Sequence, residues 1–170
     1  MSRNNTTDYL AGYSSELQQQ AGQLIDTGKL PDYLRKRYQG KHSVASSKAL
    51  YQYTLALKNT HLKKSAPLSK VEYDDRIDVI HNALGLHTHI SRVQGNKLRA
   101  KKEIRIASLF KQTPEPFLRM IVVHELAHIR EKEHNRAFYN LCQYMEPDYH
   151  QLELDLRLYL TCLELFGPLD

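Results

Sequence analysis

The spacing of apolar and polar residues predicts that the first third of the chain is helical. Three stretches there repeat apolar residues every three or four positions, and turn-forming residues separate them. Ser15 and Gln18 have the spacing of a capping box, and Gly28 is suited to end the first helix. The predicted helices run from Ser15 to Gly28, from Pro31 to a stop at Gly40, and from Ser46 or Ser47 to a stop before Pro67.

From Val71 the apolar period changes to two, which is typical of strands. Val71 and Tyr73 alternate with polar residues up to a turn at Asp74–Asp75. The further predicted strand segments are Ile77 to Val79, either a partner strand or a bent continuation, then Leu86–Val93 and Lys97–Ala107, joined by a tight turn at Gly95–Asn96. In the last of these, Ile104 and Ile106 are expected to face the core.

The stretch Met120–Ile129, MIVVHELAHI, predicts a helix that carries chemistry. His124 and His128 lie one helical turn apart, so their side chains share a face and can bind one metal ion. Glu125 is about 100° round the helix from His124, where it can reach a water on that ion without being a ligand. The run Ile121–Val123 is too apolar for an exposed face, which disfavours a surface histidine pair.

The helix is expected to begin with Thr113 as N-cap and Pro114 as its first residue, and to run to about Glu131.

The last predicted element of the chain is the segment Tyr149–Phe166. It has leucines at every second position, which is the period of a strand. Its leucine, glutamate and arginine content and the preceding Pro147 favour a helix, and we predict a helix there.

A catalytic zinc ion needs a third protein ligand and an open position. His134 follows His128 by six residues, which would place it on another helix face unless the chain bends. The charged link before it permits such a bend, and Asn135 can cap a new helix over Arg136–Met145. Glu131 and Glu133 lie in the same link and are alternative ligands, because some zinc sites use two histidines and a glutamate.

Composition indicates one ordinary globular domain. The chain has 170 residues, of which 41% are hydrophobic and 25% charged, and no repeat, low-complexity run or linker divides it. We therefore expect a single domain over 1–170, with a helical part over 1–66 and a part over 70–170 that holds the sheet, the histidine helix and the C-terminal helices. Two cysteines, Cys142 and Cys162, fit buried thiols in a reducing compartment. No apolar leader or membrane-spanning run is present, so we expect a cytoplasmic protein without membrane contact.

The net charge of +5 and the isoelectric point near 9.1 come largely from one stretch. Between Arg92 and Arg105, six lysines and arginines face one glutamate. Such a strand can attract phosphate, but a solvated strand guarded by lysine is the favoured interpretation. His87 and His89 share one strand face, yet no carboxylate accompanies them, so a second metal site is not expected.

The segment HELAHIREKEHNRAFY resembles the signature of the YgjP-like family of metal-dependent hydrolases, a minimal gluzincin group related to SprT-like domains. That signature is HELxH, five residues, histidine, then an aromatic residue four positions on. The resemblance implies an α+β, zincin-like (minigluzincin) fold, with helices packed on a three- or four-stranded sheet. It also implies that His124, His128 and His134 bind the metal and that Glu125 is the general base.

The implied activity is zinc-dependent hydrolysis, with zinc as cofactor unless another divalent metal replaces it. A metal-bound water would be activated by Glu125 and attack the substrate. Peptide hydrolysis is the first hypothesis. Phosphoanhydride cleavage of nucleoside triphosphates such as UTP is the second, because members of the family have been linked to it, and a metal-stabilised nucleic-acid-binding module is the third.

The substrate side of the site is less defined by sequence. Arg105, Arg136 and Tyr139 are weak candidates for substrate binding, and Tyr149 and His150 join the last two as candidate donors to a developing oxyanion. The expected partner is therefore a peptide or nucleotide substrate. A nucleic acid partner is disfavoured because no aromatic-rich binding motif is present, and the oligomeric state is left open.

Overall fold

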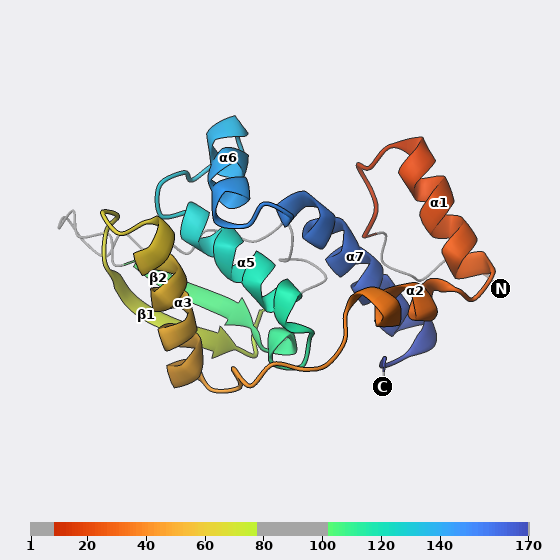
Figure 1. Ribbon diagram of the computed structural model, residues 1–170, viewed down its shortest axis with the longest axis horizontal. Coiled ribbons are helices and arrows are strands. Elements are labelled where there is room, and N and C mark those ends of the chain that lie inside the picture. Colours follow the sequence, from red (N-terminus) through yellow and green to blue (C-terminus); the bar gives the residue numbers. More distant parts are fainter. Residues whose placement is uncertain (1–8, 78–101, 170) are drawn as a thin grey trace. The chain divides into compact units, whose positions relative to one another are not determined.

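The computed structural model describes residues 9–77 and 102–169, which form helices and a two-stranded parallel sheet (Figure 1). The described residues divide into two compact units. Unit 1 consists of residues 9–40 and 150–169. Unit 2 consists of residues 41–149, without 78–101. None of the helices among these residues combines the length and the apolar character needed to cross a membrane.

Unit 1 begins with helix α1 (Ser15–Asp26) and helix α2 (Leu30–Arg37). Ser14 rather than Ser15 is the N-cap of α1, since its hydroxyl oxygen accepts a hydrogen bond from the backbone of Leu17 at 3.2 Å. The predicted stop at Gly28 is confirmed. This glycine has φ +70°, and the next amide donates to the carbonyl of Leu24 at 2.9 Å, which is the closure of a Schellman motif.

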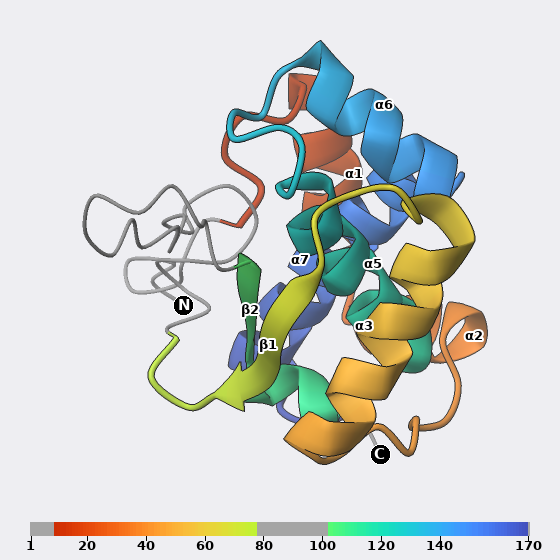
Figure 2. The same ribbon diagram turned by 90° about the vertical axis from the view of Figure 1, so that its left-hand side faces the viewer.

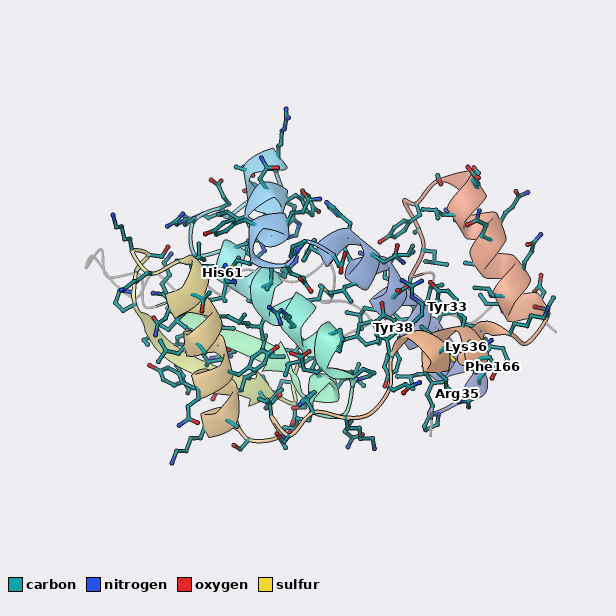
Figure 3. All side chains as sticks on the ribbon, in the orientation of Figure 1. Tyr33, Arg35, Lys36, Tyr38, His61 and Phe166 are labelled. Carbon is teal, nitrogen blue, oxygen red and sulfur yellow. The ribbon has the colours of Figure 1, made fainter. Side chains whose placement is uncertain are left out.

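Helix α7 (Tyr149–Phe166) supplies the rest of unit 1 from His150 onwards, and its helical state is as predicted. Its fully buried Asp155 accepts hydrogen bonds from the hydroxyl groups of Tyr33 and Tyr38. These two tyrosines are labelled in Figure 3, in α2 and at its C-cap. Arg37 lies 3.3 Å from the same carboxylate, so α7 and α2 are joined by a polar cluster around the buried Asp155.

Unit 2 contains helix α3 (Ser47–His61) and strands β1 (Leu68–Asp74) and β2 (Lys102–Ala107). The strands pair in parallel, with Val71 opposite Ile104 and Tyr73 opposite Ile106. All four of these side chains are buried, as the period of two predicted. Viewed edge-on in Figure 2, the sheet has α3 and helix α5 (Glu115–Ala127) on the same side, so the buried sheet face and these helices form the core of the unit.

The short 3₁₀ helix η1 (Ser108–Lys111) leads from β2 to α5 (Glu115–Ala127). The predicted N-cap is wrong, because the Thr113 hydroxyl donates to the carbonyls of Phe110 and Pro114, and Pro114 itself is the N-cap. A second proline at position 116 then occupies the first turn, where its missing N–H costs nothing.

Helix α5 also ends four residues earlier than predicted. Ala127 is its last residue and His128 is the C-cap, after which the amides of Ile129 and Arg130 bond three residues back instead of four. This tightened end allows the chain to turn. Helix α6 (Arg136–Met145) then starts at the predicted cap, where the Asn135 side chain accepts from the amide of Phe138 at 2.9 Å.

Several predicted features lie outside the described residues. These are the strand Leu86–Val93, the turn at Gly95–Asn96, the first half of the strand Lys97–Ala107, Val79, and the histidines at 81, 87 and 89. A sheet of three or four strands therefore remains a prediction. The turn at Asp74–Asp75 is confirmed, since β1 ends there and the amide of Ile77 donates to the carbonyl of Asp74 at 3.3 Å.

Candidate metal centre

Three histidines come together at the end of α5. His124 lies in the last turn of the helix, His128 is its C-cap, and His134 immediately precedes the cap of α6. The Nε2 atom of His128 is 3.2 Å from Nε2 of His124 and 3.1 Å from Nε2 of His134. The three side chains each offer one nitrogen within 4.8 Å of the others, and within the described chain they form the group of possible metal ligands.

These distances suit a small metal ion. Nitrogen ligands about 2.0–2.1 Å from a tetrahedral Zn²⁺ lie about 3.3–3.4 Å from one another, a few tenths of an ångström more than the two separations found here. His124 and His128 are 3% and 9% exposed, so the ligand nitrogens lie at the edge of the core. Three imidazole nitrogens that point at one spot can present their lone pairs to a single cation.

The other ring nitrogens have oxygen partners. Nδ1 of His128 lies 2.8 Å from the backbone carbonyl of Glu131, and Nδ1 of His124 lies 2.6 Å from the hydroxyl of Tyr149. A carbonyl oxygen can only accept, so Nδ1 of His128 carries the proton and its Nε2 presents a lone pair. Partners of this kind orient metal-binding histidines and fix which nitrogen binds.

Phe138 supports all three rings from one side. Its ring centroid is 4.4 Å from that of His128 and 4.9 Å from those of His124 and His134, and the side chain is fully buried. The sequence analysis did not single out Phe138. The signal that marks it is the aromatic residue four positions after His134 in the family signature, to which no role had been attached.

The alternative third ligands are placed differently. The Glu131 carboxylate accepts a hydrogen bond from the Asn135 side chain at 3.3 Å, while its backbone carbonyl faces His128. Glu133 is exposed. Among the described residues, neither glutamate groups with the two helix histidines, so His134 is the third residue that the structure brings to them.

Glu125 follows His124 in α5 and is half-buried. Burial raises the pKa of its carboxyl group to about 8, because removal from water disfavours the charged form. A divalent cation nearby would instead lower the pKa of this carboxyl group, because it stabilises the charged form. Desolvation and a cation together would hold the group where it can exchange a proton near neutral pH, which a general base must do.

The substrate-binding candidates lie in three different settings. Arg105, in β2, is 16% exposed, and its guanidinium faces Asp74 at 3.4 Å and Glu72 at 3.7 Å. Arg136 is exposed at the first residue of α6. The Tyr139 ring lies 6.4 Å from that of His134. Arg136 is therefore close to the histidines in sequence, and Tyr139 is close to them in space. Arg105, by contrast, takes part in a network of charges on the sheet.

Comparisons with known proteins show the family of the chain. A family model described as YgjP-like, metallopeptidase domain, matches residues 9–159. The chain is also 60% identical over 157 residues to a UTP pyrophosphatase of Escherichia coli (strain K12). The aligned region covers 92% of this chain and 94% of that relative. No solved structure matches the chain. With a divalent-metal site suggested by its three histidines and a match over most of its length, this chain belongs to the YgjP-like family of metal-dependent hydrolases.

Proposed function

We propose that this protein hydrolyses nucleoside triphosphates at a phosphoanhydride bond, with UTP as the preferred substrate. The observation that carries the proposal is the 60% identity to a UTP pyrophosphatase over 92% of the chain. An alignment of that length includes the segment that builds the metal centre. The nucleotide hypothesis, second in the sequence analysis, therefore becomes the first.

In this proposal His124, His128 and His134 bind the ion through Nε2. When bound, the ion supplies Lewis acidity for a phosphoryl oxygen and makes water a better nucleophile at neutral pH. Glu125 takes the proton of the attacking water. A bond forms between the water oxygen and the α-phosphorus, the bond to the α–β bridging oxygen breaks, and UMP and pyrophosphate leave.

The donor set also supports zinc as the ion. Imidazole nitrogens suit Zn²⁺ and its transition-metal neighbours, whereas Mg²⁺ and Ca²⁺ prefer oxygen ligands. We further propose the zincin-like fold with a three- or four-stranded sheet as a single domain over 1–170, located in the cytoplasm. These finer statements rest on the family resemblance and on the sequence pattern.

Arg136 and Tyr139 are the proposed substrate contacts. Arg136 follows His134 by two residues and is exposed, and a guanidinium can bind phosphate oxygens in a bidentate manner. The Tyr139 ring beside His134 offers a hydroxyl donor for charge that develops on the phosphoryl group. Arg105 is a weaker candidate because two carboxylates already face its guanidinium.

Peptide hydrolysis is the second candidate function. It is favoured by the HExxH arrangement of His124, Glu125 and His128 and by the description of the family model as a metallopeptidase domain. The same activated water can attack a peptide carbonyl or a phosphoryl group, so the metal centre alone does not select between these substrates.

The two functions are separated by a substrate panel. Metal-stripped protein is reloaded with Zn²⁺, Mn²⁺, Co²⁺ or Ni²⁺, and each form is assayed on the four nucleoside triphosphates and on unstructured peptides, with and without added Mg²⁺. We expect UTP to give UMP and pyrophosphate in equal amounts. Release of UDP and phosphate would move the attack to the γ-phosphorus, and peptide cleavage without nucleotide turnover would reverse the order of the two candidates.

The role of the general base is tested with Glu125→Gln. We expect kcat to fall by about 10²–10⁴-fold with metal content unchanged, because the amide cannot accept the proton. Glu146→Gln, at the C-cap of α6, is the matched control and should retain activity. Full turnover by metal-loaded Glu125→Gln would remove this residue from the mechanism.

A further inference from the structure

Tyr149 is a buried neighbour of the metal centre with an unusual type of contact. It is the first residue of α7 and is 0% exposed. Its hydroxyl oxygen lies 2.6 Å from Nδ1 of His124, and the two rings are nearly parallel, with an interplanar angle of 22°. His128 has a backbone carbonyl as its Nδ1 partner. Two adjacent histidines of the same site therefore have chemically different partners.

The difference concerns which way the hydrogen bond can run. A carbonyl oxygen only accepts, so His128 keeps its proton on Nδ1 at all times. A phenol hydroxyl either accepts or donates. His124 can therefore place its proton on Nδ1, donating to Tyr149, or on Nε2, with Tyr149 donating to Nδ1.

One of these two tautomers fits the metal-bound site, and the other fits the metal-free site. An ion on Nε2 of His124 requires the proton on Nδ1, where the oxygen of Tyr149 accepts it. Without an ion, a proton on Nε2 of His124 can be donated to the lone pair on Nε2 of His128, 3.2 Å away. Tyr149 satisfies His124 in both conditions, and a carboxylate or carbonyl in its place would satisfy only the first.

We propose that Tyr149 is a positioning residue that sets the tautomer of His124 and thereby the affinity of the site for its metal ion. This inference rests on the proposed metal site. The hydroxyl contacts Nδ1 of His124, whereas the ion would bind Nε2, so Tyr149 acts through His124 and does not touch the reacting atoms. Of the donors considered for the developing oxyanion, Tyr149 is thereby removed, and Tyr139 stays.

Loss of the hydroxyl should weaken metal binding selectively. In Tyr149→Phe the metal-loaded form has a buried N–H at Nδ1 of His124 without its acceptor, whereas the metal-free form has only a nitrogen lone pair without its donor. A buried N–H without a partner is the less tolerated of the two. Because Tyr149→Phe destabilises mainly the metal-loaded protein, it should reduce the affinity of the site for the metal ion.

The test compares Tyr149→Phe with Tyr159→Phe, the same substitution at another buried tyrosine of α7. Zn²⁺ affinity is measured by competition with a chromophoric chelator, and the melting temperature of each metal-free protein is recorded. We expect Tyr149→Phe to bind Zn²⁺ about 10–100-fold more weakly, the usual effect of losing such a partner. Tyr159→Phe should bind as the wild type does, and the metal-free melting temperatures should stay close together.

Unchanged Zn²⁺ affinity in folded Tyr149→Phe would overturn the role of Tyr149. His124→Ala distinguishes this failure from failure of the site itself, because stoichiometric zinc in that variant would overturn the metal centre. If Tyr149→Phe does not fold, long-range ¹H–¹⁵N spectra of the zinc-loaded wild type decide. A proton on Nδ1 of His124 supports the proposal, and coordination through Nδ1 overturns it.

Discussion

The metal centre and the cluster around Asp155 are two buried polar groups built on different principles. In the Asp155 cluster, a fully buried carboxylate accepts hydrogen bonds from Tyr33 at 3.0 Å, from Gln151 at 3.2 Å and from Tyr38, with Arg37 3.3 Å away. Acceptors there are surrounded by donors. In the metal centre, three ring nitrogens of the same kind point at one another.

We infer from this difference that the Asp155 cluster is a structural group and that the three histidines form a binding group. A buried carboxylate with matched donors is satisfied within the protein, so its natural contribution is to stability and to holding α2 against α7. Three imidazole nitrogens that face one another are stabilised most by a bound metal ion, which is not part of the protein itself. The type of atoms that face each other, rather than burial alone, indicates which buried polar group binds a ligand.

The proposed difference between the two groups is tested most directly at the metal centre. We expect His134→Ala to lower Zn²⁺ affinity by more than the about 10–100-fold that loss of an outer partner costs, because a direct ligand is removed. The melting temperature of the metal-free protein should change little. Metal content after dialysis and chelator competition measure the effect, and His61→Ala, a histidine that contacts Tyr144 outside the site, is the control. Full zinc content in His134→Ala would transfer the ligand role to Glu131 or Glu133.

The opposite pattern is expected at Asp155. Asp155→Asn removes the charge that faces Arg37 and one of the acceptors used by Tyr33 and Tyr38, so unfolding should cost about 3 kcal/mol less, at the lower end for a broken buried charge network because Arg37 can reach water. Urea denaturation of the metal-free protein measures this change. Zn²⁺ affinity should equal that of the wild type, and a large loss of affinity would contradict the separation of the two groups.

The sequence was informative for the metal centre because its residues are local. His124 and His128 are related by one helical turn, and His134 follows within six residues. Spacing and a cap at Asn135 made His134 a candidate beside Glu131 and Glu133, and the resemblance to the YgjP-like signature singled it out. Whether they bind a metal stays a prediction. The helix boundary was less predictable, because Pro114 and Pro116 compete for the first turn and tertiary packing buries Thr113.

The Asp155 cluster was not predicted. Asp155 is 122 residues from Tyr33 and 117 from Tyr38, and no periodic pattern relates positions so far apart. The same limit applies to Tyr149, which follows His124 by 25 residues and was one of several candidate donors. Local spacing and the family signature propose the ligands of the site, whereas the residues that orient them depend on how distant segments pack.

Alkaline pH gives a further test of the Asp155 cluster. Burial and the neighbouring Asp155 charge raise the pKa of Tyr33 to about 12, and the pKa of Tyr38 is raised further for the same reasons. A phenol pKa raised above its unfolded value of about 10 means that the folded state holds the proton more tightly. The stabilisation is therefore complete below pH 10 and is lost as the pH rises through 12.

In Asp155→Asn the charge contribution to both shifts is absent, so stability should decline less steeply between pH 10 and 12 than in the wild type. Urea midpoints over this range, with phenolate absorbance at each pH, measure the slope. Tyr73, whose burial also raises its pKa to about 12, contributes equally to both proteins and cancels in the difference. Parallel slopes would show that the Asp155 charge does not control these tyrosines.

The smallest expected effect compares two helix caps, one next to the metal centre and one in unit 1. Asn135 accepts from the amide of Phe138 at 2.9 Å and directly follows His134, while Ser14 accepts from the amide of Leu17 at 3.2 Å in unit 1. Replacing either by alanine should cost about 1 kcal/mol of stability, since each removes one cap hydrogen bond. Only Asn135→Ala should also weaken Zn²⁺ binding, because the cap fixes where the chain turns after His134. Equal Zn²⁺ affinity in both variants, at equal loss of stability, would mean that Phe138 and the neighbouring rings hold His134 in place without the cap.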